Sequence, residues 1–213
     1  MTEQKELDTQ TDATREQTKK QKHKERQQKV KEKVDAKIAK ATEDKGLLLV
    51  VTGNGKGKST AGFGMAARSV GHGLNVGVVQ FIKGTWDCGE RNLLEQHGVP
   101  FYVMATGFTW ETQDKEKDTA AAQAVWQDAK KLLSDPSVNV VLLDEITYMT
   151  NYGYIDLDEV IDTLANRPAD QHVVITGRAC HRRIIEMADT VSEVQSIKHA
   201  FEAGIKVQKG IDW

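Results

Sequence analysis

Cysteine is scarce in this chain, and the two that occur, Cys88 and Cys180, are far apart among 213 residues. Two such cysteines cannot form a disulfide framework, and they lack the clustered partners of a zinc site. We therefore expect a reducing, cytoplasmic setting for the protein.

Long apolar runs are also missing. None approaches the roughly 20 residues that a membrane-spanning helix needs, and the charged N-terminus lacks the apolar centre of a signal peptide. The formal net charge of −2 provides no general attraction to nucleic acid or to an anionic membrane. We expect a soluble cytoplasmic protein with no membrane or nucleic-acid partner, of a length that suits one domain with an appendage.

Residues 1–45 contain no aromatic residue, no glycine and no proline. We expect a disordered tail over residues 1–13 and a charged helical arm over residues 14–45. The apolar residues of the arm recur every four positions and form one narrow stripe: Val30, Val34 and Ile38. Three interpretations stay open: a solvated helix or tail, a mobile arm whose stripe docks on the body, and a nucleic-acid arm. Interspersed acids and the lack of aromatics argue against the third.

Residues 46–213 alternate between strand-like and helix-like segments. Strands are predicted at 47–52, 76–82, 100–104, 138–144 and 172–176. Helices are predicted near 58–70, 89–97, 119–134, 156–166 and 181–188. Several strands are apolar on successive residues, which indicates burial on both faces by helices. The fold class is therefore α/β, a three-layer domain on a mostly parallel sheet, with ligands beyond the carboxyl ends of the strands.

Residues 46–60, GLLLVVTGNGKGKST, have the order of a phosphate-binding P-loop: an apolar strand, a glycine-rich turn, and a helix that starts at a lysine and a hydroxyl residue. Glycines let the backbone aim its N–H groups at an anion, and the start of the helix adds the positive end of its dipole. Thr52 stands where the usual pattern has its leading glycine, and Lys56 is an additional lysine in the loop. We expect nucleotide phosphates to bind Gly53, Asn54, Gly55, Lys56, Gly57, Lys58, Ser59 and Thr60.

An apolar strand that ends in Asp144 and Glu145 is the expected second half of such a site. A carboxylate there reaches a phosphate-bound Mg²⁺ directly or through water, and the Ser59 hydroxyl is a further ligand. Which acid contacts the metal stays open. Arg178, at the end of the fifth predicted strand, is either a phosphate ligand or an arginine that lies at the surface or pairs with a carboxylate.

Phe108 and Trp110 lie in a polar, glycine-containing stretch after the third predicted strand. They are either core residues or a wall against a large flat ligand, which Trp86 could join. His181 is expected to open a helix, and His72 to lie in a turn that ends one.

Several segments, in order, resemble the P-loop type of bacterial ATP:corrinoid adenosyltransferases, the cob(I)yrinic acid a,c-diamide and cob(I)alamin adenosyltransferases. They are GNGKGKST, VGHGLNVGVVQFIKGTW, GERNLLE, MATGFTWETQ, VVLLDEITYM, VVITGR, ADTVSEV and KHAFEAGIKVQKGIDW. The resemblance runs from about residue 26 to the C-terminus. The missing leading glycine is itself typical of the family, whereas Ser59 stands where the family often has threonine.

The resemblance implies that a cobalt(I) corrinoid attacks the 5′ carbon of ATP and that triphosphate leaves, in adenosylcobalamin biosynthesis and corrinoid salvage. It implies ATP bound in the reverse sense along the loop, Mg²⁺, a reduced flavoprotein as electron donor, and a homodimer. Phe108 and Trp110 match positions that face the corrin and displace the lower axial ligand of cobalt. Lys58, with these two aromatics, is expected to carry the catalysis.

Two other functions compete with this one. The acids Asp144 and Glu145 and the basic arm also suit a RecA-like ATPase, although the irregular loop and the aromatic stretch argue against it. A small-molecule kinase would need an arginine-rich lid, and none is apparent. The leaving group separates these readings, because only adenosyl transfer releases triphosphate.

Overall fold

The computed structural model describes residues 2–82, 87–104 and 114–212, with side chains described from Lys19 onward. Its internal contacts divide the chain between Asp44 and Lys45 into two units. Among the described residues, no helix is both long and apolar enough to cross a membrane.

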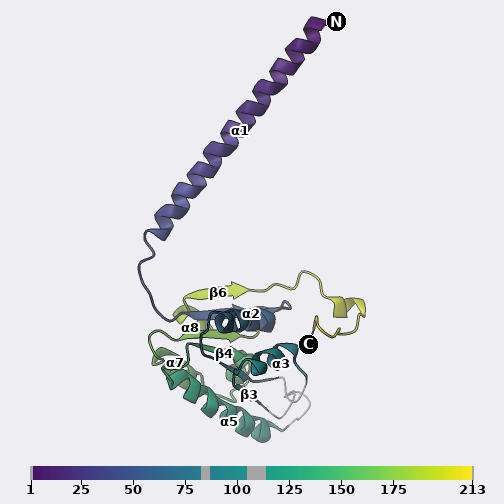
Figure 1. Ribbon diagram of the computed structural model, residues 1–213. Coiled ribbons are helices and arrows are strands. Elements are labelled where there is room, and N and C mark those ends of the chain that lie inside the picture. The colour runs from purple at the N-terminus through teal and green to yellow at the C-terminus, as the bar shows by residue number, and fades with distance from the viewer. Residues whose placement is uncertain (1, 83–86, 105–113, 213) are drawn as a thin grey trace. The chain divides into compact units, whose positions relative to one another are not determined.

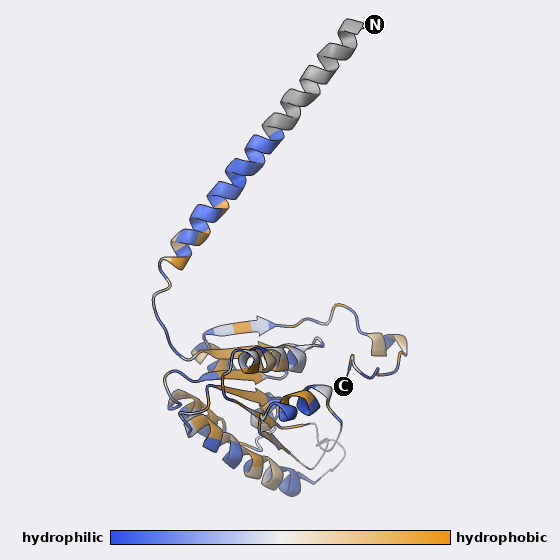
Figure 2. Ribbon diagram, in the orientation of Figure 1, coloured by the Kyte–Doolittle hydropathy of each residue, from blue (hydrophilic) through white to orange (hydrophobic). Residues whose placement is uncertain are grey.

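The first unit consists of one long helix, α1 (Thr2–Ile38), drawn in purple in Figure 1. It starts well before residue 14, so it includes residues 2–13, for which we expected disorder. Glu, Lys, Gln and Ala favour helix, and no glycine or proline interrupts them. The described part of α1 is almost wholly hydrophilic in Figure 2, and its apolar stripe is exposed, with exposed fractions of 54% for Val30, 46% for Val34 and 65% for Ile38.

The second unit is built on a six-stranded sheet with the order β3-β2-β4-β5-β1-β6 (Figure 1). Every pair of neighbouring strands is parallel. The strands are β1 (Leu48–Thr52), β2 (Val76–Gln80), β3 (Phe101–Val103), β4 (Val140–Asp144), β5 (His172–Thr176) and β6 (Thr190–Glu193). The α/β fold class with a parallel sheet is thereby confirmed.

Helices cover both faces of this sheet and bury its central strands β1, β2, β4 and β5. The described helices of this unit are α2 (Lys58–Gly71), α3 (Gly89–Gln96), α5 (Lys115–Ser134), α6 (Ile146–Asn151), α7 (Leu157–Ala165) and α8 (Arg182–Met187), with a 3₁₀ turn η1 (Ala200–Ala203). Successive residues of β4 point to opposite faces, so Val141 and Leu143 join one core cluster with α5, α6, α7 and α8. Leu142 joins the other cluster, with α2 and α3. The central strands are accordingly coloured hydrophobic in Figure 2.

Two elements were not predicted. The edge strand β6 has the sequence TVSE with all four residues exposed, so it lacks the apolar run that marks the buried strands. The short helix α6 directly follows Asp144 and Glu145, which we had interpreted only as the end of a strand. The five predicted strands all form, and each lies at its predicted place.

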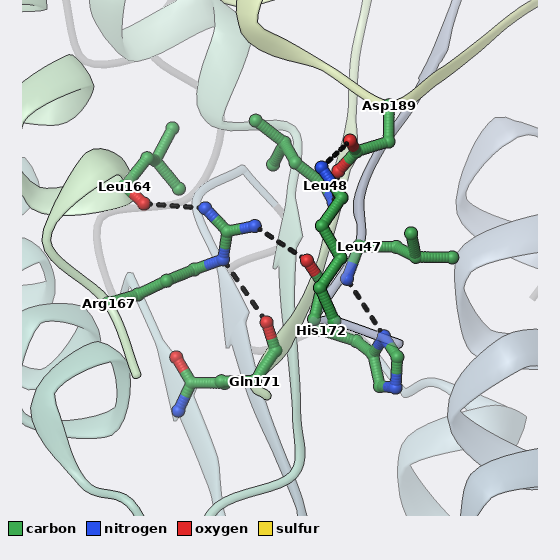
Figure 3. Close-up of polar contacts among 9 residues, drawn as sticks. Leu47, Leu48, Leu164, Arg167, Gln171, His172 and Asp189 are labelled. Carbon is green, nitrogen blue, oxygen red and sulfur yellow. Dashed lines mark hydrogen bonds and ion pairs between the residues drawn. The ribbon is translucent and has the colours of Figure 1, made fainter. Parts of the chain in front are cut away.

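At the amino-terminal edge of the sheet, one arginine binds three carbonyl groups (Figure 3). The Arg167 guanidinium donates to the carbonyl oxygens of Leu164, Gln171 and Gly46, at 2.7, 3.1 and 3.1 Å. Beside it, Asp189 accepts a hydrogen bond of 2.8 Å from the Leu48 amide. These bonds hold the start of β1 in register, which positions the loop at its other end.

Candidate active site

The carboxyl ends of β1, β4 and β5 meet at one edge of the sheet, with β5 between the other two. A cavity of about 240 Å³ opens there, at the place where parallel α/β sheets bind ligands. Its walls come from the β1–α2 loop, from the ends of β4 and β5, and from segments far along the chain. The lining residues are Asn54, Gly55, Lys56, Gly57, Lys58, Ser59, Thr60, Glu90, Glu145, Arg178, His199 and Asp212.

The glycines of the loop are required by close packing and by backbone conformation. A Cβ at Gly53 would lie 2.4 Å from the carbonyl oxygen of Val194, and a Cβ at Gly55 would lie 2.5 Å from that of Gln195. The Gly55 amide donates to the Val194 carbonyl at 2.7 Å, so the segment after β6 supports the loop. Gly57, with φ of 110°, has the left-handed backbone that glycine adopts most easily, and α2 starts directly after it.

Thr52, which replaces the usual leading glycine, has a structural use. Its hydroxyl accepts a hydrogen bond of 3.3 Å from the Cys180 amide, in the turn after β5. This bond ties the loop to the turn that carries Arg178. The departure from the common pattern therefore connects two walls of the cavity.

Lys58 is a buried charge at the start of α2, and 6% of its surface is exposed. Its ammonium group donates to the Gly55 carbonyl at 2.8 Å, across the loop. Burial lowers the pKa of Lys58; Arg178 lowers it further, whereas the carboxylates of Glu145 and Asp144 act in the opposite direction. A poorly hydrated cation at the start of a helix is well suited to a phosphate group.

Asp144 is held rigidly at the end of β4. It is 1% exposed, and its Oδ1 accepts from the Thr176 hydroxyl at 2.7 Å. Its Oδ2 accepts from the Gln80 amide group at 3.3 Å. Thr176 also accepts from the Glu145 amide at 3.0 Å, so one hydroxyl positions both acids.

Glu145, unlike Asp144, lines the cavity. Its backbone has φ of 63°, a conformation that is costly for a residue other than glycine and that tends to occur at functional sites. This turn breaks the line of β4 and starts α6, so the carboxylate leaves the strand at the wall of the cavity.

Oxygen atoms at this wall fit Mg²⁺. The half-buried Ser59 and Glu145 line the same cavity, and Asp144 is close enough to Lys58 to raise its pKa. Within the described ranges, no cluster of three or more His, Cys, Asp or Glu side chains could hold an ion by itself. The residues therefore suit an ion that arrives with substrate phosphates, since Mg²⁺ is commonly held by one or two carboxylates together with phosphate oxygens.

The structure brings together most of the residues predicted from the sequence. Asn54 to Thr60, Glu145 and Arg178 line one cavity, whereas Gly53 and Asp144 are each next in sequence to a lining residue. His181 caps the start of α8 and accepts from the Arg183 amide, and His72 follows the end of α2, as expected for both. Trp86, Phe108 and Trp110 lie outside the described residues.

Sequence reasoning missed five residues of the site. Thr176 and Gln80 are polar residues at the ends of apolar strands, and that position was the signal that could have found them. Glu90, His199 and Asp212 also line the cavity, but no local spacing relates them to the loop.

Comparison with known proteins agrees with this geometry. The model of the ATP:corrinoid adenosyltransferase family BtuR/CobO/CobP matches residues 44–213. The corrinoid adenosyltransferase CobA of Salmonella typhimurium is 64% identical over 179 residues, which cover 84% of this chain and 91% of that protein. The corrinoid adenosyltransferase of Pseudomonas aeruginosa is 52% identical over 181 residues, covering 84% of this chain and 89% of that protein.

Among solved structures, the flagellar accessory protein FlaH of Methanocaldococcus jannaschii superposes with a TM-score of 0.48 at 13% identity, covering 70% of this chain and 71% of that one. That likeness is too weak to bear on function. The family match covers the whole second unit, including the loop, both acids and Arg178. The chain therefore belongs to the ATP:corrinoid adenosyltransferase family.

Proposed function

We propose that this chain holds the triphosphate of ATP on the β1–α2 loop while a reduced corrinoid attacks the ribose. The chain is an ATP:corrinoid adenosyltransferase, which moves the adenosyl group of ATP to the corrinoid. The observation that carries the proposed mechanism is the shared cavity, in which the loop, Lys58, Glu145 and Arg178 converge.

The reaction is a displacement at carbon. The cobalt(I) corrinoid supplies both electrons of the new cobalt–carbon bond at the 5′ carbon. The bond from that carbon to oxygen breaks, and its electron pair leaves with triphosphate. No water attacks phosphorus, so the protein needs no base; it must align the two reactants and stabilise the charge of the leaving group.

The loop stabilises the leaving group. Lys58 and Lys56 supply positive charge, and the amides of the loop and the start of α2 supply hydrogen-bond donors. Arg178 is exposed and lines the same cavity, and we assign to it a contact with the same phosphates. Reverse binding of ATP along the loop follows from the family resemblance alone, and it would bring Lys56 against the terminal phosphate.

Mg²⁺ belongs to this proposal as a companion of ATP. Ser59 and Glu145 would hold it, with Asp144 in support. When bound, it neutralises part of the triphosphate charge and so makes the triphosphate a better leaving group.

The corrin side of the site rests on Phe108 and Trp110. We assign to them the displacement of the lower axial ligand, since four-coordinate cobalt is reduced more easily to the nucleophilic state. We further propose a reduced flavoprotein as the electron donor, a homodimer as the working state and the cytoplasm as the compartment. Within the described residues, Cys88 and Cys180 form no disulfide, which is compatible with such a reducing setting.

Product analysis tests the proposal. The protein is incubated with ATP, Mg²⁺ and chemically reduced cob(I)alamin. Ion chromatography then identifies the phosphate product, and the absorbance spectrum follows the cobalt–carbon bond. We expect one triphosphate for each adenosylated corrinoid. ADP and phosphate, formed at the same rate with and without corrinoid, would support the RecA-like ATPase, which the comparisons do not favour.

A further inference from the structure

A lysine of the loop already has an anionic partner. Lys56 forms an ion pair with Asp212, although the two residues lie at opposite ends of the second unit's sequence. Both side chains line the cavity that holds Lys58 and Ser59. The Asp212 carboxylate is only 17% exposed, whereas the Lys56 side chain is 47% exposed. A carboxylate therefore lies where an anion would meet the loop.

The orientation of this carboxylate is set by its own turn. Asp212 Oδ2 accepts a hydrogen bond of 2.6 Å from the Gln208 amide, and the Asp212 amide donates to the Gln208 carbonyl at 2.8 Å. This leaves Oδ1 directed at Lys56. The hydrogen bond from Lys56, followed by that from Gln208, lowers the pKa of Asp212, so the group is ionised near neutral pH.

The segment that carries Asp212 contacts the loop at both of its ends. It leaves β6, forms η1 and returns (Figure 1, yellow). At its start, the Val194 carbonyl accepts a hydrogen bond from the Gly55 amide. At its end, Asp212 forms the ion pair with Lys56. Between them, Ile197 and Phe201 are 87% and 73% exposed. Because these apolar side chains bury little surface, the Lys56–Asp212 ion pair contributes to holding the returning end against the loop.

We infer that the Asp212 carboxylate and a triphosphate oxygen compete for the same position beside the Lys56 ammonium group. By this competition, Asp212 speeds release of the triphosphate product. The inference rests on the proposed function, since it needs triphosphate on the loop. Triphosphate bears several negative charges, and a loop with two lysines holds it tightly after the adenosyl group has left. When Asp212 pairs again with Lys56, the lysine regains a counter-charge as the product leaves. The same competition weakens the binding of ATP and of product alike.

Binding of inorganic tripolyphosphate to the full chain tests this. Asp212→Asn removes the charge but keeps an oxygen for the Gln208 amide, so the turn persists. We expect the dissociation constant for tripolyphosphate, measured by calorimetry, to fall roughly fivefold, the scale of one partly exposed ion pair. Inhibition of turnover by added tripolyphosphate should strengthen by a similar factor.

Two further variants make the test specific. In a Lys56→Met background, Asp212→Asn should no longer change the affinity, because the partner is gone. Glu202→Gln removes an exposed carboxylate of η1 that does not line the cavity, and it should leave the affinity unchanged. Unchanged or weaker binding in Asp212→Asn, or an equal gain without Lys56, overturns the inference.

Lys58→Ala separates this inference from the proposed function. If Lys58→Ala weakens tripolyphosphate binding while Asp212→Asn leaves it unchanged, the loop site stands and the role of Asp212 is wrong. If Lys58→Ala leaves binding unchanged, the loop is not the triphosphate site, and both proposals fail.

Discussion

Lys58 is a charged side chain that the fold keeps largely out of water. It compensates with one hydrogen bond to the Gly55 carbonyl and with the nearby carboxylates of Glu145 and Asp144. Because water screens it poorly, its attraction to a phosphate is stronger than that of a surface lysine. At the residue scale, we therefore predict that Lys58 is the most sensitive position of the loop.

Lys58→Ala should reduce the adenosylation rate at saturating ATP by roughly 10²- to 10³-fold, the range for loss of one group that stabilises a leaving anion. The fold should survive, since the lysine is a buried charge whose removal ends a desolvation cost. Steady-state kinetics and thermal unfolding measure the two effects. Arg68→Ala, in the last turn of the same helix, is the matched control and should behave as the unchanged protein does. Near-normal turnover in Lys58→Ala would rule the assignment out.

Glu145→Ala should raise the Mg²⁺ concentration needed for half-maximal activity without abolishing corrinoid binding. Glu145 lines the cavity, whereas both oxygens of Asp144 already accept hydrogen bonds. Glu145→Gln is the matched variant, because it keeps the side-chain length and removes only the charge. Titration of activity with Mg²⁺ measures the effect. An unchanged Mg²⁺ dependence in both variants would make Asp144 the candidate ligand.

Phe108→Ala and Trp110→Ala should impair adenosylation most when a weak flavin reductant supplies the electrons. The defect should shrink when cobalt(I) substrate is supplied already reduced, because the proposed contribution eases reduction and not alkyl transfer. Rates with the two electron sources, measured on the same preparation, test this. Equal losses under both conditions would make these rings simple packing residues.

At the scale of elements, the carboxyl ends and the amino ends of the parallel strands have different roles. The carboxyl edge bears the cavity, and the amino edge bears the bonds that align β1 with β5 and β6. Asp189 belongs to the second group, since it accepts from the Leu48 amide and pairs with Lys45. The hydrogen bond from Lys45, then that from Leu48, lowers the pKa of Asp189.

Asp189→Asn should lower the stability of the second unit at neutral pH by about 1 kcal/mol, the scale of one such hydrogen bond. Since the folded-state pKa lies below the ordinary value near 3.8, Asp189 stabilises the fold above that value. The contribution is lost as the pH falls through the lower folded-state pKa. In urea unfolding between pH 7 and pH 3, the free energy of unfolding of the variant should therefore fall less steeply with decreasing pH than that of the unchanged protein.

Asp158→Asn is the control for this prediction, because Asp158 pairs with Arg183 while its side chain is 70% exposed. Exposed pairs contribute little. If Asp158→Asn and Asp189→Asn change the pH dependence of the free energy of unfolding equally, the hydrogen bonds of Asp189 stabilise the fold no more than an exposed ion pair does.

At the scale of the whole molecule, the arm and the body differ in what they can bury. The stripe of Val30, Val34 and Ile38 can bury only a modest apolar area, worth on the order of a few kcal/mol. An association of that size suits a lid that opens and closes. We expect deletion of residues 1–40 to weaken corrinoid retention and to leave the α/β body folded, as measured by equilibrium binding and circular dichroism.

Substitutions in the full-length chain refine the arm prediction. Changing the three stripe residues to alanine keeps the helix and removes most of the apolar area, so it should reproduce the deletion. The matched control changes lysines on the adjoining positions: Lys29→Ala, Lys33→Ala and Lys37→Ala. Unchanged corrinoid affinity after both the deletion and the stripe substitutions would indicate that the arm is only a solvated helix.

The sequence by itself determined those features whose signals are local. The loop from Gly53 to Thr60 was predictable because strand, glycines, lysine and helix follow one another within one short stretch. The buried strands were predictable because they are apolar on successive residues. The edge strand β6 was not, since its exposed residues carry no such pattern.

Only the tertiary structure decided which distant residues share the site. Strand β5 lies between β1 and β4, so Thr176 meets Asp144 and Thr52 meets the turn after β5. The chain order of the strands does not specify that neighbourhood. The pairing of Lys56 with Asp212 depends on the path of an exposed segment with no periodic signal. Local propensity acts over a few residues, whereas such contacts depend on the packing of the whole sheet.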